Sequence, residues 1–141
     1  MMLDPTKSLC EANQQIIVSK DDGEKRMHRA LNKQKRYCVR QYKLDGGIVL
    51  QQTCCDFLLL NDTLRNAYFI ELKGGNIDDA IPQLEAGYER FRSELGKYNF
   101  YFRIVSSKVR THNVQKNRFR KFKDKWGSHL QYKENILEEK L

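Results

Sequence analysis

Hydrophobic residues in the first quarter of the chain recur at intervals typical of helices. We expect one helix over residues 6–18 and a second over residues 22–34. The second segment has an apolar stripe at helical spacing, formed by Met27, Ala30 and Leu31. Two aspartates stand at its start as candidate N-caps, Asp21 and Asp22. The chain is therefore expected to begin with two helices.

The pattern then changes to the apolar and polar alternation that is typical of strands. Residues 37–44 alternate in this manner, and residues 48–52 resume extended character. Between them, Asp45-Gly46-Gly47 is a turn signal. These segments together predict a first β-hairpin.

Two short apolar runs predict a second hairpin. Residues 54–60 and 68–73 are separated by the polar segment 61–66, which we expect to be the loop. A symmetric antiparallel register about this loop places Leu60 opposite Ala67, Leu58 opposite Phe69 and Asp56 opposite Glu71. Two carboxylates would then face each other across adjacent strands.

After Gly74-Gly75 the hydrophobic period becomes helical. A helix is expected over residues 79–95, because one face carries an apolar series at helical spacing. That series is Ile81, Leu84, Tyr88, Phe91 and Leu95. Asp78 and Asp79 are expected to complement the positive end of this helix. Residues 98–106 return to strand alternation, so the order α-β-β-β-α-β predicts an α/β or α+β fold with a mixed sheet flanked by helices.

The length of 141 residues and the mass of 16.7 kDa suit one domain with its own core, so we expect residues 1–141 to form a single domain. No segment approaches the roughly 20 apolar residues that cross a bilayer, and no charged-then-apolar leader opens the chain. The four cysteines form no Cys-x-x-Cys pair, which favours reduced thiols over zinc or disulfide sites. We expect a cytoplasmic protein without a membrane partner.

The net charge of +8 is concentrated in two segments. Residues 25–43 contain eight Lys and Arg and no acid, and residues 103–125 contain nine against the single acid Asp124. Basic stretches interleaved with aromatic residues suit nucleic acid, because cations neutralise phosphates and rings offer stacking faces. The alternative is a solvated face that keeps the protein soluble through its charge. We expect a nucleic-acid partner, with DNA favoured over RNA.

The opposed acids Asp56 and Glu71 suggest chemistry, because like charges directly across a strand pair are destabilising unless something compensates them. A divalent cation such as Mg²⁺ or Mn²⁺ would do so, taking one or two carboxylates and leaving its other positions to water and phosphate. Lys73 follows Glu71 by two residues and so shares its strand face. An ammonium there can orient water and offset charge developing on a phosphate. The trio predicts phosphodiester hydrolysis.

These residues resemble the PD-(D/E)XK nuclease superfamily, which includes restriction endonucleases and Holliday-junction resolvases. The matching features are Asp56 at the start of an apolar strand, fourteen intervening residues, and Glu71-Leu72-Lys73 at the end of the next strand, before a helix and a strand. The resemblance covers residues 37–105. It implies a restriction-endonuclease-like α-β-β-β-α-β core, cleavage of nucleic acid that depends on Mg²⁺ or Mn²⁺, and Asp56, Glu71 and Lys73 as catalytic residues, with the two acids as metal ligands.

The sequence departs from the superfamily pattern in places. Cys55 stands where the family has a proline, a substitution that such folds often tolerate. Many members add a glutamate from the first helix as a metal ligand, and here Glu24 is favoured over Glu11 because it begins the helix that leads into the first strand. One subgroup places Gln and Tyr four apart on the helix after the motif, whereas Gln83 and Tyr88 are five apart. That subgroup is therefore not indicated.

Candidate nucleic-acid contacts lie on the helix after the motif and in the two basic segments. They are Gln83, Arg40, Lys43, Arg118, Lys121 and Lys125. In the basic C-terminal segment, residues 103–126, three aromatic residues are spaced for one helix face: Phe119, Phe122 and Trp126. This spacing favours packing of the rings in the core, with the basic residues outward, over stacking of the rings on bases.

Other interpretations stay open at this stage. The trio could be a structural ion network in which Asp56 pairs with Lys73, and Glu71 with Arg40 or Lys43. The chain could also be an inactive nuclease-fold module that binds nucleic acid or a protein, or a basic RNA- or ribosome-associated protein without an active site. Cleavage of both strands of a duplex needs two sites, so a homodimer is a further expectation.

Overall fold

The structure is a computed structural model that describes residues 1–109 and 116–141, so Arg110 and His112 of the basic segment lie outside the described residues. The strands are β1 (Ile16–Lys20), β2 (Met27–Leu31), β3 (Val39–Lys43), β4 (Phe57–Asn61), β5 (Asn66–Lys73), β6 (Asn99–Ser106), β7 (Leu130–Glu134) and β8 (Ile136–Lys140). The helices of the described part are α1 (Ala80–Phe91) and α3 (Asn117–Trp126). Neither is long and apolar enough to cross a membrane.

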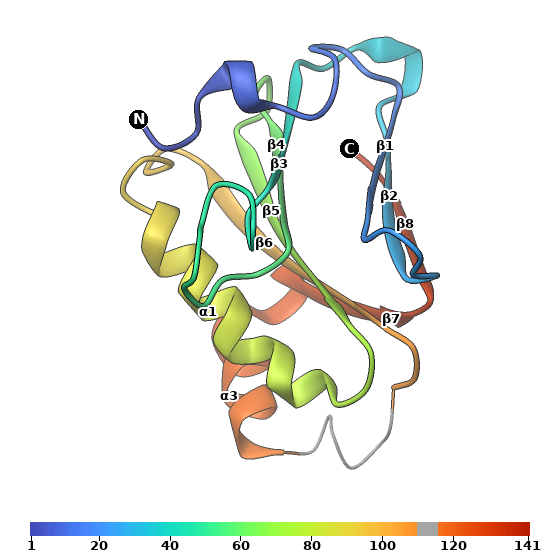
Figure 1. Cartoon of the computed structure of the whole chain (residues 1–141), viewed down its shortest axis with the longest axis vertical. Helices are drawn as coiled ribbons and strands as arrows, with labels where there is room; N and C mark the ends of the chain where they lie inside the picture. Colours follow the sequence, from blue (N-terminus) through green and yellow to red (C-terminus); the bar gives the residue numbers. More distant parts are fainter. Residues whose placement is uncertain (110–115) are drawn as a thin grey trace.

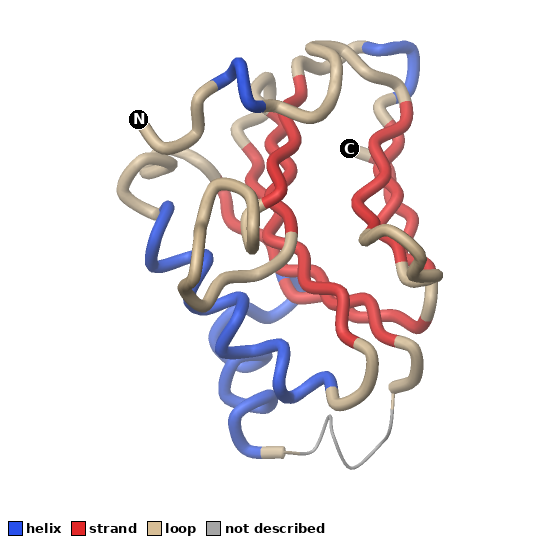
Figure 2. The backbone as a smooth tube through the Cα atoms, in the orientation of Figure 1, coloured by secondary structure: helices blue, strands red, loops and turns tan. Residues whose placement is uncertain are grey.

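Two mixed sheets and the helices make this an α+β protein. The larger sheet has the order β3-β4-β5-β6-β7, in which the β3–β4 and β4–β5 pairs are antiparallel and the β5–β6 and β6–β7 pairs are parallel. The smaller sheet has the order β1-β2-β8, in which β8 runs parallel to β2. Figure 1 shows α1 and α3 together on one side of the large sheet, and Figure 2 shows the small sheet as a separate group of strands.

The two faces of the large sheet bury different partners. Alternate residues along β4 and β5, such as Leu58 and Phe69, pack toward the helices in one buried cluster. The intervening residues, such as Leu59 and Ile70, join Ile17 and other residues of the small sheet in a second cluster. The large sheet is therefore the middle of three layers, and all five β4 residues are buried, as expected for a strand covered on both faces.

The prediction of two N-terminal helices over residues 6–18 and 22–34 is wrong. Apart from the short 3-10 turns Pro5–Lys7 and Lys33–Lys35, the ordered elements there are β1 and β2, which form an antiparallel hairpin. The run Ile16-Ile17-Val18 is β-branched, which suits a strand better than a helix. The tight turn between the strands contains Gly23 at φ 77°, a left-handed conformation that glycine adopts readily.

The prediction that residues 37–44 pair with residues 48–52 in a first hairpin is also wrong. β3 forms as expected, but it pairs with β4, and this pairing continues through bonds from the backbone N–H groups of Leu44 and Asp45 to the carbonyl oxygens of Asp56 and Cys55. Residues 48–52 belong to a loop. Its turn doubles back so closely that a Cβ on Gly47 would lie 2.2 Å from the Lys43 carbonyl oxygen.

The second hairpin and the elements after it are confirmed. β4 and β5 pair with Leu58 opposite Phe69 and Leu60 opposite Ala67, the expected register. α1 and β6 follow where the hydrophobic period predicts a helix and a strand. The run β3-β4-β5-α1-β6 thus supplies the β-β-β-α-β part of the expected order, whereas the helix expected before it is replaced by the β1–β2 hairpin.

The acidic pair stands at the start of α1 as expected, and Asp78 also contacts a second helix. The Asp78 carboxylate accepts a hydrogen bond of 3.1 Å from the backbone N–H of Phe119 in the first turn of α3, and one of 2.8 Å from Arg118. Asp78 thus caps the basic helix from outside, because its carboxylate satisfies a free N–H and complements the helix dipole.

Replacing Asp78 with alanine is expected to lower the free energy of unfolding by about 1–2 kcal/mol, the usual cost of losing a helix cap. Urea denaturation followed by circular dichroism measures the change. The matched control is Asp79→Ala, because Asp79 also contacts Arg118 but its side chain is 54% exposed. That variant is expected to stay within about 0.5 kcal/mol of the wild type. Equal losses in the two variants would contradict the capping role.

Candidate active site

The two candidate carboxylates meet where β4 begins and β5 ends. Phe57 pairs with Ile70, and continuing this register by one residue brings Asp56 opposite Glu71. Asp56 lies just before β4, and its Oδ2 accepts a hydrogen bond of 2.8 Å from the backbone N–H of Leu72. This bond holds the Asp56 side chain against β5.

The Glu71 carboxyl group is buried beside that of Asp56. Glu71 is 6% exposed, and its Oε1 has no hydrogen-bond partner among the described residues. Burial and the charge of Asp56 raise the pKa of Glu71 to about 9, although Lys73 acts in the opposite direction. Burial also raises the pKa of Asp56, against the opposing effects of the Leu72 N–H and Lys43. Without a cation, the pair therefore retains a proton at neutral pH.

Lys73 ends β5 two residues after Glu71, on the same side of the strand, and is half-buried. Its positive charge lowers the pKa of Glu71, but among the described residues its ammonium forms no ion pair with Asp56, which pairs with Lys43. In the parallel pairing with β6 it lies opposite Ser106, whose buried Oγ also lacks a partner in the described part of the chain. The end of β5 therefore gathers two acids, an ammonium and a hydroxyl.

Lys43 is the basic residue that forms ion pairs with Asp56 and with Asp21. Its Nζ lies 3.5 Å from Asp56 Oδ1 and 3.1 Å from Asp21 Oδ1. Burial opposes the charged form, but Asp56 and Asp21 outweigh it and raise the pKa of Lys43. A cavity of about 450 Å³ opens beside Lys43 and Asp21, which line it together with residues such as Gln41 and Phe57. Sequence reasoning assigned Lys43 to nucleic acid or, in the alternative ion network, to Glu71 rather than Asp56, and it took Asp21 for a helix cap.

Glu24 does not join the acid pair in the manner expected. There is no first helix to carry it, so Glu24 lies in the turn between β1 and β2, where it pairs with Arg26 at 3.2 Å. Glu11, the other candidate, is exposed in the N-terminal segment. Asp21, at the start of the same turn, is the acid of this segment whose charge raises the pKa of Asp56. The Asp21-Asp22-Gly23 sequence after the Ile-Ile-Val run was the available signal for this turn.

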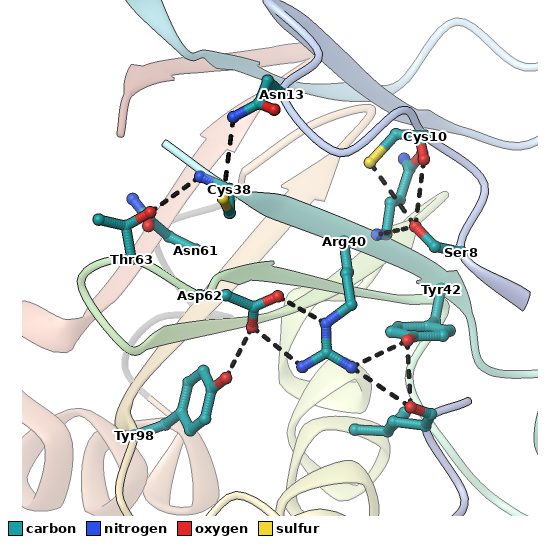
Figure 3. Close-up of polar contacts among 12 residues, drawn as sticks. Ser8, Cys10, Asn13, Cys38, Arg40, Tyr42, Asn61, Asp62, Thr63 and Tyr98 are labelled. Carbon is teal, nitrogen blue, oxygen red and sulfur yellow. Dashed lines mark hydrogen bonds and ion pairs between the residues drawn. The ribbon is translucent and has the colours of Figure 1, made fainter. Parts of the chain in front are cut away.

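Arg40, a candidate nucleic-acid contact, has its donors engaged within the protein. Its guanidinium donates to Asp62 at 2.6 and 2.9 Å, to the Tyr42 hydroxyl at 3.0 Å and to the Leu3 carbonyl at 3.3 Å. The Tyr98 hydroxyl also donates to Asp62, at 2.6 Å. Figure 3 shows this network converging on the Asp62 carboxylate. Arg40 therefore anchors the N-terminal segment to β3.

The other candidate contacts lie on the two helices. As expected, Phe119 and Phe122 are buried and Trp126 is partly buried against the core. Lys121 and Lys125 are exposed on the outer side of α3. The Arg118 side chain is 46% exposed but pairs with Asp78, and Gln83 is half-buried in the first half of α1.

The donor set fits a hard divalent cation. Asp56 and Glu71 offer carboxylate oxygens, which Mg²⁺ and Mn²⁺ prefer, and one of these oxygens is buried without a partner. No group of three or more metal-ligating side chains is gathered anywhere in residues 1–109 and 116–141. Such a cation would therefore be held by two carboxylates, with water and substrate oxygens completing its coordination, as is usual for Mg²⁺.

Comparisons with family models, with curated proteins and with solved structures found no match to this chain.

In the metal-free protein, Glu71→Gln is expected to raise the free energy of unfolding. The carboxyl group titrates near its ordinary 4.5 when unfolded and near 9 when folded. Its favourable contribution is therefore complete below about pH 4.5 and is lost as pH rises toward 9, whereas glutamine stays neutral. The advantage of the variant should grow to about 1–3 kcal/mol near pH 8, measured by urea denaturation with EDTA. Equal stabilities at about pH 5 and pH 8 would contradict this expectation.

Proposed function

We propose that this protein is a metal-dependent nuclease that hydrolyses phosphodiester bonds, with DNA favoured over RNA as the substrate. The observation that carries the proposal is the buried, unpartnered Glu71 oxygen beside the Asp56 carboxyl group and on the strand that ends in Lys73. Two close carboxyl groups that are largely buried cost stability unless positive charge compensates both of them, and Lys43 contacts Asp56 alone. A divalent cation with a substrate phosphate is the partner that this chemistry fits.

Each residue then has a distinct role. Asp56 and Glu71 would hold the cation, which supplies Lewis acidity at the phosphate and lowers the pKa of the attacking water. The Leu72 N–H fixes Asp56, so that the acid needs little reorganisation when substrate arrives. The Lys73 ammonium would orient the water and offset negative charge that develops on the phosphate oxygens.

Basic side chains near the end of β5 would guide the nucleic acid to this site. Arg26 donates to the Ser107 hydroxyl at 2.9 Å and lies beside Gly74, one residue after Lys73. The first turn of the basic helix α3 is capped by Asp78, which follows Lys73 by five residues, and α3 carries Lys121 on its outer face. Phosphates bound along this path would release counterions, so binding should weaken as salt concentration rises.

The proposal is tested by incubating the purified chain with plasmid, single-stranded, branched and RNA substrates in Mg²⁺, in Mn²⁺ and in EDTA. Cleavage of at least one substrate that requires the cation and is lost in both Asp56→Ala and Lys73→Ala is the expected result. Cleavage that survives both substitutions would remove these residues from the mechanism. Binding without cleavage in every condition would favour an inactive nucleic-acid-binding module instead.

A further inference from the structure

The two oxygens of Asp56 are unequally available to a cation. Oδ2 accepts the backbone N–H of Leu72 at 2.8 Å, which leaves Oδ1 as the oxygen free to bind a metal. The Lys43 ammonium lies 3.5 Å from this same Oδ1. A divalent ion bound there would sit against a positive charge, and two cations at such a separation repel strongly in a partly buried site. Lys43 and the metal therefore compete for one oxygen.

Lys43 already has a second carboxylate within reach. Its Nζ is closer to Asp21 Oδ1, at 3.1 Å, than to Asp56 Oδ1, and Asp21 comes from the β1–β2 turn rather than from the large sheet. The side chains of Lys43 and Asp21 are about one third exposed, while that of Asp56 is 13% exposed. The neighbouring cavity of about 450 Å³ gives the ammonium room to move toward Asp21.

We infer that Lys43 is an internal counter-ion of the metal-free site, which leaves Asp56 for Asp21 when a divalent cation binds. This inference rests on the proposed function, since it concerns the cation that the nuclease would use. Lys43 and Asp21 are then positioning residues: Lys43 stabilises the empty site at the cost of metal affinity, and Asp21 receives the ammonium that the metal displaces.

The two residues should consequently affect metal affinity in opposite directions. Removing the charge of Lys43 removes the competitor, so binding should tighten by about tenfold, a usual size of coupling between two sites. Removing the charge of Asp21 leaves the ammonium with Asp56 alone, so binding should weaken severalfold. Because Asp21 acts on metal binding chiefly through Lys43, Asp21→Asn should have a smaller effect in a chain that already carries Lys43→Met.

The test is calorimetric titration of Mn²⁺ into the wild type, Lys43→Met, Asp21→Asn and the double variant. Lys20→Met is the matched control, because exposed Lys20 lines the same cavity and its loss changes the net charge equally. It should stay within about twofold of the wild type. Met preserves the packing of Lys43 over the Phe57 ring, and Lys43→Gln is a second variant in case Lys43→Met folds poorly.

Tighter Mn²⁺ binding in Lys43→Met than in both the wild type and Lys20→Met supports the inference, even where the wild type binds too weakly to measure. Wild-type binding with unchanged or weaker affinity in Lys43→Met and Lys43→Gln overturns the inference and leaves the proposed function standing. Absence of Mn²⁺ binding in the wild type and in both Lys43 variants overturns the inference and the proposed metal site together.

Discussion

Replacing Asp56 with asparagine is expected to reduce phosphodiester cleavage by at least about a thousandfold. The substitution keeps the shape of the side chain and its contact with Leu72 but removes the charge that would hold the cation. Losing one group that stabilises charge in the transition state typically lowers the rate by a factor of about 10²–10³. Losing a metal ligand also lowers the occupancy of the metal site. Initial rates on the preferred substrate at saturating Mn²⁺ measure the effect.

The control for this prediction is Asp22→Asn, which makes the same change of charge on an exposed residue of the cavity beside Lys43. Its rate should remain within about threefold of the wild type, as for surface sites without shared partners. Thermal melts verify that both variants fold. An Asp56→Asn enzyme with more than about a tenth of the wild-type rate would show that the charge is not required, contrary to the proposed mechanism.

Glu139→Gln is expected to lower the free energy of unfolding by about 3 kcal/mol, the largest stability effect that we anticipate. Glu139 of β8 binds the buried Arg103 of β6 through two hydrogen bonds, at 2.8 and 3.0 Å, and also contacts His28 of β2 at 2.6 Å. It therefore joins the small sheet to the large one. The variant would leave the Arg103 charge, 3% exposed, without its counter-ion. Urea denaturation at neutral pH measures the loss.

The same carboxylate gives this contribution a defined pH range. Burial opposes ionisation, but hydrogen bonds from His28 and Arg103 lower the pKa of Glu139 to about 2, against an ordinary value of 4.5. The stabilisation is therefore complete above about pH 4.5 and is lost as pH falls toward 2. The matched control is Glu138→Gln, whose pair with Arg29 is half exposed. A loss below about 1 kcal/mol, or one equal to the control, would contradict the bridging role.

Local pattern was sufficient where partners are close in the sequence. The loop 61–66 and the apolar runs on either side of it fixed the register of β4 and β5, and that register brought Asp56 to Glu71. The apolar face of α1 and the aromatic face of α3 were likewise readable from period alone. In each case burial of one strand face or one helix stripe decides the structure, and the apolar residues that form this face or stripe can be recognised by their spacing in the sequence.

Local pattern failed where the partner is remote. Met27, Ala30 and Leu31 are spaced for one helix face, whereas in β2 the buried Ala30 lies on the face opposite the other two. The strand is formed by pairing with β1 and with β8, which lies at the far end of the chain. The contact of Lys43 with Asp21 depends on the β1–β2 hairpin, so the sequence pattern did not predict this contact either. Such contacts form only through tertiary packing, which overrides weak local preference.

A crystal soaked in Mn²⁺ would show whether Asp56 and Glu71 hold a cation, because manganese is located by its anomalous scattering without any assumption about substrate. We expect a peak at the end of β5, about 2.0–2.5 Å from one carboxylate oxygen of Asp56 and one of Glu71, with the Lys43 ammonium moved toward Asp21. Manganese bound only elsewhere, with no peak beside Asp56 or Glu71, would contradict it.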